Sequence, residues 1–288
     1  MATHTLYRYR IMQIASTAKH QVLTLKHLPP LSTTAARLLE MLSDEDLSLE
    51  QLSGVISQDP GISARILGVA NSAYFGQTTP IHSVEDAVIR VLGLNMVRSL
   101  SFSLAISGSF DTSRCGSFDL EAYWYRALAT AALSRLICSH IVMDERPDPD
   151  GVYLAGLLFD IGALVLIHLF PESYATVLDK SEEGDRQDLA RFEEEIIGIS
   201  SREAGGWLLD RWHLPPRIVQ VVQQSGQDEV VESDLVDTAA AWVSHDVKKG
   251  SDPVQGFRAI PSDKIEIIQA EFLRQDDGIR AVANLLAY

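Results

Sequence analysis

Cysteine is scarce in this chain of 288 residues, with only Cys115 and Cys138 present. The two lie far apart and form no Cys-x-x-Cys pair, which excludes a disulfide framework and a thiolate metal site. We therefore predict two reduced, structural thiols in a cytoplasmic protein.

Basic residues are also in the minority. Lys and Arg number 24 against 39 Asp and Glu, which gives a formal net charge of −15. No run of Lys or Arg interrupts this excess, so the chain lacks the basic stripe that phosphate binding uses. We expect no direct binding of nucleic acid.

Long apolar runs are missing from the N-terminus, where residues 1–21 contain no continuous apolar region and no small-residue cleavage site. A secretion signal is therefore not expected. One later stretch, Val152 to Phe170, is about as long as a membrane span, but Asp160 lies at its centre close to Gly162. We interpret it as a buried core helix that breaks near the glycine, and we expect no membrane insertion.

Helical periodicity, in contrast, runs through most of the chain. Hydrophobic residues make up 46% of it, enough for a sizeable core. They recur at helical spacing, whereas alternating strand patterns of useful length do not occur. The predicted fold class is all-α, a multi-helix bundle, and the polar stretch from Phe110 to Ser117 marks a boundary between two sub-bundles.

Local signals place the ends of the first helices. Ser48 to Gln51 has the pattern of a capping box, and Asp59-Pro60 that of an N-cap followed by proline at the first helical position. The second of these helices should end near Asn71. Asparagine tolerates the left-handed conformation at a helix C-terminus, and its side chain can bond to nearby backbone.

Similar signals predict the remaining helices. Helix starts are expected at or directly after Ser83, Gly93, Asp119, Pro171, Ser200 or Ser201, and Pro215 or Pro216. Three further helices should follow, over Asp237 to Lys249, Lys264 to Arg274 and Gly278 to Ala287.

Three stretches of the first half carry a family pattern: LPPLSTTAARLLEML from Leu28, ISQDPGISARILGVANSAYFG from Ile56, and IHSVEDAVIRVLGLNMVRSL from Ile81. The second half continues it with GLLFDIGALVL from Gly156, LFPESY from Leu169 and GGWLLDRWHLPPRIV from Gly205. The chain thereby resembles the HDOD family, output domains related to metal-dependent His-Asp phosphohydrolases. The signature positions in the first half are Asp59, Pro60, Asn71, Ser72, Gly76 and Gly93.

The resemblance implies a domain organisation. Residues 1–27 would form an N-terminal helical extension, and residues 28–225 the HDOD domain. Within that domain we expect an N-terminal sub-bundle over 28–115 and a sub-bundle like the phosphohydrolases over 116–225. Residues 226–288 would add C-terminal helices that pack on the second sub-bundle.

The resemblance also implies that the ancestral metal site is lost. Such phosphohydrolases hold divalent metals with imidazoles and carboxylates. Here the paired His-Asp falls at Phe159-Asp160, so that only the carboxylate remains. An earlier histidine corresponds to Arg126, whose permanent charge prevents it from ligating a cation, and a later one aligns near Ser201.

Further ligand positions align with Gln224-Ser225 and with Ala240 or Ala241. The eight histidines of the chain are scattered without metal-ligand spacing. The expectation is therefore no catalytic residue, no bound metal and no cofactor. Asp160 should accept hydrogen bonds inside the bundle and pair with Arg126, because an unpaired buried carboxylate is costly.

The signature residues also have structural interpretations. We favour a role for Asn71 and Ser72 in stabilising the corner after their helix over contact with a partner. Gly76 would serve a turn, anchored by Tyr74 and Phe75, and a glycine-flanked aromatic pair of this kind is better buried than exposed. We predict that both rings lie at the join between the two sub-bundles.

Three functions are left open. The resemblance favours a non-catalytic bacterial signalling module that binds other signalling proteins. The alternatives are a sensor that binds a nucleotide or another small anion in the old cavity beside Arg126 and Asp160, and a surviving phosphohydrolase with an unrecognised site. The stretch from Glu182 to Glu203 has eight acids and three arginines, which is typical of a solvated face and less often of a surface for a basic partner.

Overall fold

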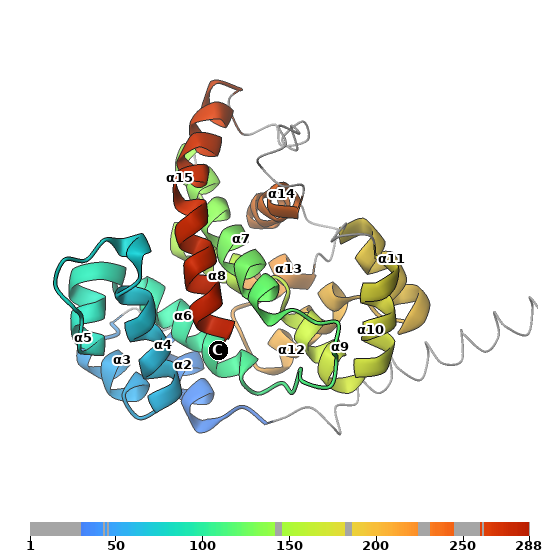
Figure 1. Cartoon of the computed structure of the whole chain (residues 1–288), viewed down its shortest axis with the longest axis horizontal. Coiled ribbons are helices and arrows are strands. Elements are labelled where there is room, and N and C mark those ends of the chain that lie inside the picture. The colour runs from blue at the N-terminus through green and yellow to red at the C-terminus, as the bar shows by residue number, and fades with distance from the viewer. Residues whose placement is uncertain are drawn as a thin grey trace, which may run out of the picture. The chain divides into compact units, whose positions relative to one another are not determined.

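The computed structural model describes residues 30–42, 44, 46–141, 146–181, 186–223, 231–244, 260 and 262–287. Over these residues it is helical and has no strand, which confirms the predicted all-α class (Figure 1). They form two compact units. The first, here the α7 unit, contains 31–109, 120–158 and the described residues from 231 onward; the second, the α12 unit, contains 110–119 and the described residues from 159 to 223. The predicted N-terminal extension over 1–27 lies outside the described residues.

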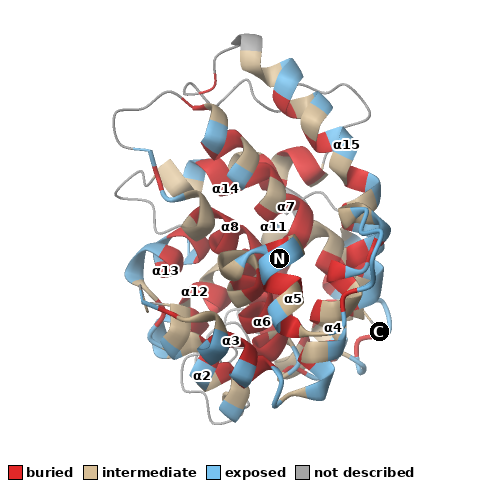
Figure 2. Ribbon diagram, turned by 90° about the vertical axis from the view of Figure 1, so that its left-hand side faces the viewer, coloured by how far each residue is buried: buried red, intermediate tan, exposed pale blue. Residues whose placement is uncertain are grey.

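The α7 unit is built around its longest buried helix. α7 packs against α8, α14 and α15, and Figure 2 shows many of its residues buried. Trp124, Leu133 and Ile137 of α7 are each at most 2% exposed. The elements of the unit are α2 (Thr33–Leu42), α3 (Leu49–Ile56), α4 (Pro60–Ala70), η1 (Ala73–Phe75), α5 (Val84–Ala87), η2 (Val88–Leu92), α6 (Leu94–Ser107), α7 (Leu120–His140), α8 (Pro149–Leu158), α14 (Val231–Ser244) and α15 (Ser262–Ala287).

The α12 unit is organised by contacts of α12 with α9 and α13. Its elements are α9 (Ile161–Leu169), α10 (Pro171–Lys180), α11 (Arg186–Ile196), α12 (Ser201–Arg211) and α13 (Pro216–Gln223). α9 and α12 meet through glycines. A Cβ atom on Gly162 would lie 1.7 Å from the carbonyl oxygen of Ser201, and one on Gly205 would lie 3.0 Å from the backbone nitrogen of Gly162. The two helices approach this closely because neither position carries a side chain.

The helix starts predicted from N-capping residues are confirmed for α3, α4, α5 and α12. The Ser48 hydroxyl accepts from the Gln51 backbone nitrogen at 3.2 Å, and the Gln51 side chain accepts from the Ser48 nitrogen at 2.8 Å, which completes the capping box. Asp59 accepts from the Ile62 nitrogen at 3.0 Å, with Pro60 in the first turn. Ser83 and Ser200 cap α5 and α12 in the same way.

Asn71 ends α4 as predicted, but the left-handed conformation proposed for it is wrong. Its φ is −90°, and the chain reverses instead at Gly76, whose φ is +58°. The Asn71 side chain donates to the carbonyl oxygens of Leu67 and Ile81, at 2.9 and 2.8 Å, and accepts from the Ile81 nitrogen at 2.7 Å. One side chain therefore joins the end of α4 to the segment that leads into α5.

Two predictions about the C-terminal helices are wrong. α14 begins at Val231, not near Asp237, and α15 runs unbroken from Ser262 to Ala287, not as two helices divided before Gly278. Gly278 is needed for packing, because a Cβ atom there would lie 1.9 Å from the ring of Tyr74. The glycine lets α15 pass close to η1, and the helical hydrogen bonds continue through it.

Tyr74 and Phe75 are half-buried, which is less burial than the expected packing of this aromatic pair between helices. The two rings touch edge to face, with centroids 4.6 Å apart, and the Tyr74 hydroxyl donates to Gln275 of α15 at 2.9 Å. Their position within the α7 unit is thus set by α15, which sequence analysis placed among the C-terminal additions.

The apolar stretch from Pro149 to Leu169 is long and hydrophobic enough to cross a membrane, but 89% of its 18-residue window is buried inside the structure. It is broken into α8 and α9 at Phe159 and Asp160, which confirms the predicted break near Gly162. Both cysteines are free and buried, and burial raises the pKa of each thiol.

The contact between α9 and α12 predicts a large effect of one methyl group. We expect Gly162→Ala to lower the free energy of unfolding by about 3 kcal/mol or more, because the added methyl overlaps a backbone carbonyl that cannot rotate away. The matched control is Gly54→Ala in α3, where a Cβ atom meets nothing within 4 Å. That change should stabilise the protein by about 0.5–1 kcal/mol. Urea unfolding of both variants measures the difference, and equal stabilities would contradict the helix contact.

Candidate functional site

The turn between α8 and α9 holds Phe159 and Asp160, which the family resemblance aligns with the ancestral His-Asp pair. Phe159 is 4% exposed and Asp160 is 9% exposed, so both are buried. The Asp160 carbonyl oxygen accepts from the Ala163 nitrogen at 2.9 Å, which begins α9, while the carboxylate does not cap that helix. The backbone of Asp160 thus forms the first hydrogen bond of α9, while its side-chain carboxylate makes no hydrogen bond to the start of the helix.

A guanidinium group covers the ring of Phe159. The central carbon of the Arg202 side chain lies 4.4 Å from the ring centroid, within cation–π distance. Arg202 also donates to the carbonyl oxygen of Val221, at 3.1 Å, which ties α12 to α13. A fixed positive charge therefore lies next to Phe159, the residue that the family resemblance aligns with a metal-binding imidazole. Arg202 directly follows Ser201, but no sequence pattern marked it as a site residue.

Ser201 takes part in a buried carboxylate site. Its backbone nitrogen donates to Glu193 Oε2 at 2.7 Å, and the Tyr174 hydroxyl donates to Glu193 Oε1 at 3.1 Å. Glu193 is 1% exposed. Burial raises the pKa of Glu193 to about 7, the charge of Asp160 acts in the same direction, and the hydrogen bonds from Ser201 and Tyr174 oppose the rise.

Glu193 corrects the prediction that the acidic stretch from Glu182 is a solvated face throughout. Glu194 and Glu195 are exposed, but Glu193 points inward. A signal was present in the sequence: residue 193 lies four positions after Leu189 and three before Ile196, on the apolar side of α11. The side chains of residues 182–188 lie outside the described part of the structure.

The structure places the other predicted site positions in different parts of the chain. Phe159, Asp160 and Ser201 belong to the α12 unit, whereas Arg126 lies on α7 in the α7 unit. The pairing of Arg126 with Asp160 therefore stays a prediction. Ala240 and Ala241 lie on α14 of the α7 unit, and Gln224-Ser225 lie outside the described residues. Among the residues described, no group of three or more His, Cys, Asp or Glu side chains is arranged to hold a metal ion.

The six family-signature residues all belong to the α7 unit. Asp59 caps α4, Pro60 begins it, and Asn71 bonds the backbone after it. Gly76 and Gly93 have φ values of +58° and +79°, which favour glycine. The Ser72 hydroxyl is buried and has no hydrogen-bond partner among the described residues. Five of the six thus have a backbone role.

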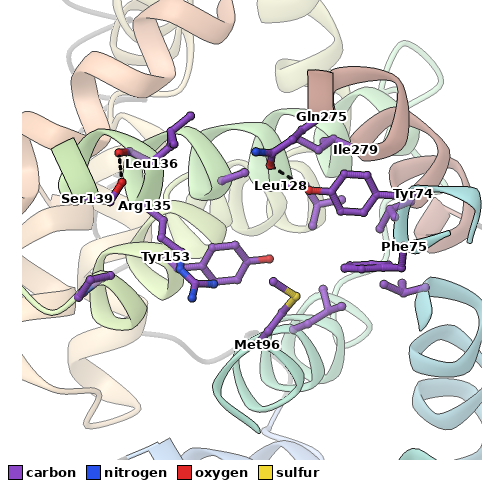
Figure 3. Close-up of a pocket in the computed structure, with 15 residues that line it drawn as sticks. Tyr74, Phe75, Met96, Leu128, Arg135, Leu136, Ser139, Tyr153, Gln275 and Ile279 are labelled. Carbon is purple, nitrogen blue, oxygen red and sulfur yellow. Dashed lines mark hydrogen bonds between the residues drawn. The ribbon is translucent and has the colours of Figure 1, made fainter. Parts of the chain in front are cut away.

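A cavity of about 430 Å³ lies apart from these residues, within the α7 unit. It is open on one side and is lined by residues of α4, η1, α6, α7, α8 and α15 (Figure 3). Tyr74 and Phe75 line one side of it, and Tyr153 of α8 lines another.

Glu193 predicts a pH-dependent stability. Its folded-state pKa of about 7 lies above the ordinary 4.5, so the folded protein binds more protons than the unfolded chain between these values. The resulting stabilisation is complete below pH 4.5 and is lost as the pH rises through 7, in total roughly 3 kcal/mol. Glu193→Gln carries no charge, so it should gain stability relative to the wild type between pH 5 and 8 in urea unfolding. The exposed Glu194→Gln is the control, and parallel pH curves for wild type and Glu193→Gln would contradict the assignment.

Solved structures with similar folds come from several bacteria. A proposed signal transduction protein of Marinobacter aquaeolei VT8 has a TM-score of 0.76 and 21% identity, over 95% of this chain and 66% of that one. A proposed phosphohydrolase of Shewanella amazonensis SB2B has a TM-score of 0.72 and 22% identity, over 93% and 97% of the two chains. An HDOD domain protein of unknown function from Geobacter sulfurreducens has a TM-score of 0.60 and 22% identity, over 96% and 94%.

By sequence, the chain is 24% identical over 197 residues to an uncharacterised protein of Treponema pallidum (strain Nichols). The match covers 68% of this chain but only 37% of the relative's length. The model of the HDOD domain family matches residues 28–227, which is more than half of the chain. The chain therefore belongs to the HDOD domain family.

Proposed function

We propose that the chain is a non-catalytic signal-transduction module that acts in the cytoplasm by binding other signalling proteins. The observation that carries the proposal is the Arg202 guanidinium 4.4 Å from the ring of Phe159. An arginine is always protonated, and its charge repels a divalent cation at this distance. The ancestral position has thus lost a metal ligand and gained a positive charge.

The carboxylates that remain do not replace the lost ligands. A phosphohydrolase metal must be held by several ligands while open positions activate water and polarise phosphate. Glu193 has its two oxygens engaged by Tyr174 and Ser201, and burial favours its protonated form. Asp160 alone does not supply a ligand set, so the proposal includes no hydrolytic activity and no cofactor.

Binding of a nucleotide or another small anion at this site has weaker support than binding of proteins. Arg202 would attract an anion, but Asp160 and Glu193 place two acidic groups in the same unit, close enough for the charge of Asp160 to raise the pKa of Glu193. The net charge of −15 also opposes nucleic acid as a partner.

The absence of hydrolysis is directly testable. Protein purified without a metal-affinity column should contain no stoichiometric iron, manganese or zinc. It should not hydrolyse p-nitrophenyl phosphate or cyclic nucleotides in added manganese, because one carboxylate beside a guanidinium holds no catalytic metal. Elemental analysis and the two assays, with Asp160→Ala as the matched variant, measure this. Near-stoichiometric metal together with turnover that Asp160→Ala abolishes would overturn the proposal.

The positive part of the proposal needs a defined partner. Affinity capture of the tagged protein from its own cells, followed by reconstitution of a complex from the purified components, tests it. A stoichiometric complex that persists with Asp160→Ala would support an interaction role independent of the remnant site, here Phe159, Asp160, Ser201 and Arg202. A thermal shift produced by nucleotides, with no protein captured, would favour the sensor instead.

A further inference from the structure

The cavity of the α7 unit has the size and lining of a small-molecule site. Its volume of about 430 Å³ falls in the range of roughly 300–1,000 Å³ that ligand pockets occupy. Most of its wall is apolar, with Met96 and Leu100 from α6, Leu128 from α7, and Ile279 and Val282 from α15. A mostly apolar wall with a few polar groups is typical of pockets that bind small organic molecules.

Tyr153 directs its hydroxyl group into the cavity. Tyr153 is 7% exposed, and its hydroxyl is directed toward the space between Met96 and Tyr74 (Figure 3). Among the described residues this hydroxyl has no hydrogen-bond partner, whereas the Tyr74 hydroxyl donates to Gln275 at 2.9 Å. Burial raises the pKa of Tyr153, which keeps its hydroxyl protonated as a donor. The hydroxyl faces the open space of the cavity, where it can donate a hydrogen bond to an acceptor that a ligand brings.

Arg135 supplies the charge of the cavity wall. The lining residues include this arginine and no Asp or Glu. Its guanidinium lies 6.0 Å from the centroid of the Tyr153 ring, and one nitrogen lies 3.4 Å from an oxygen of Asp150. The side chain of Arg135 is 44% exposed, so this ion pair is weak, and four of the five N–H donors of a guanidinium remain for a ligand.

We propose that the cavity binds a small apolar molecule that ends in a carboxylate. The apolar body contacts Leu100, Leu128 and Ile279, a carboxylate oxygen accepts the hydrogen bond of Tyr153, and Arg135 provides the counter-charge. None of these residues belongs to the remnant site of the α12 unit. The inference is therefore independent of the proposed signalling role.

Octanoate is a suitable probe, because it joins a short apolar chain to one carboxylate. The full-length protein is labelled with ¹³C at its methionine methyl groups, and the Met96 signal, assigned with Met96→Leu, is followed during titration. We expect a saturable shift of that signal. Octan-1-ol, which has the same chain without the charge, should bind at least threefold more weakly.

Two variants test the polar contacts. Tyr153→Phe removes only the hydroxyl and should raise the dissociation constant of octanoate about three- to tenfold, the usual effect of one hydrogen bond. Arg135→Gln should raise it by a similar factor. Arg90→Gln is the charge-matched control, because Arg90 is exposed on η2 and does not line the cavity. It should leave the affinity unchanged.

Three results would overturn the proposal. One is an unshifted Met96 signal at saturating octanoate in protein with normal melting. Another is equal affinity for octanoate and octan-1-ol, which would remove the carboxylate from the assignment. The third is an equal loss of affinity in Arg135→Gln and Arg90→Gln, which would point to the overall charge of the protein instead of this cavity.

Discussion

The close approach of α9 and α12 is the constraint on which the remnant site depends. Gly162 leaves room for the carbonyl oxygen of Ser201, so the start of α12 lies directly against the start of α9. That register brings Arg202 over Phe159 and presents the Ser201 nitrogen to Glu193. Any side chain at residue 162 would push α9 and α12 apart. It would also move Arg202 away from Phe159. The same backbone contact thus determines both packing and electrostatics.

Local hydrogen bonding explains why much of the fold could be predicted from sequence. A capping box at Ser48, a proline after Asp59 and the side chain of Asn71 each act within about ten residues, so their partners are visible in the sequence. The all-α class follows from periodicity for the same reason, since a helix bonds only to itself. The resemblance added a predicted position for a lost metal site, which no local pattern would have indicated.

What could not be predicted depends on partners distant in the chain. Gly278 was predicted to separate two helices. A glycine that ends a helix cannot be distinguished by sequence from a glycine that makes room for a neighbouring aromatic ring, here that of Tyr74. Glu193 looked like part of a solvated acidic run, and only its contacts with Tyr174 and Ser201 show that it is buried. The role of Arg202 likewise depends on its contact with the ring of Phe159, which lies more than 40 residues earlier in the chain. Such roles are determined by tertiary packing and override local composition.

The contact between Tyr74 and α15 has a consequence for how the protein folds. The hydrogen bond from Tyr74 to Gln275 joins residues 201 positions apart. Closing so long a loop costs conformational entropy before any contact compensates for it, and contacts of this span form slowly. During synthesis η1 leaves the ribosome long before α15, so the hydrogen bond between Tyr74 and Gln275 cannot form until α15 has been made. The wall of the cavity is therefore assembled in two stages separated in time, and the apolar surfaces of α6 and α7 that face it are exposed in the interval.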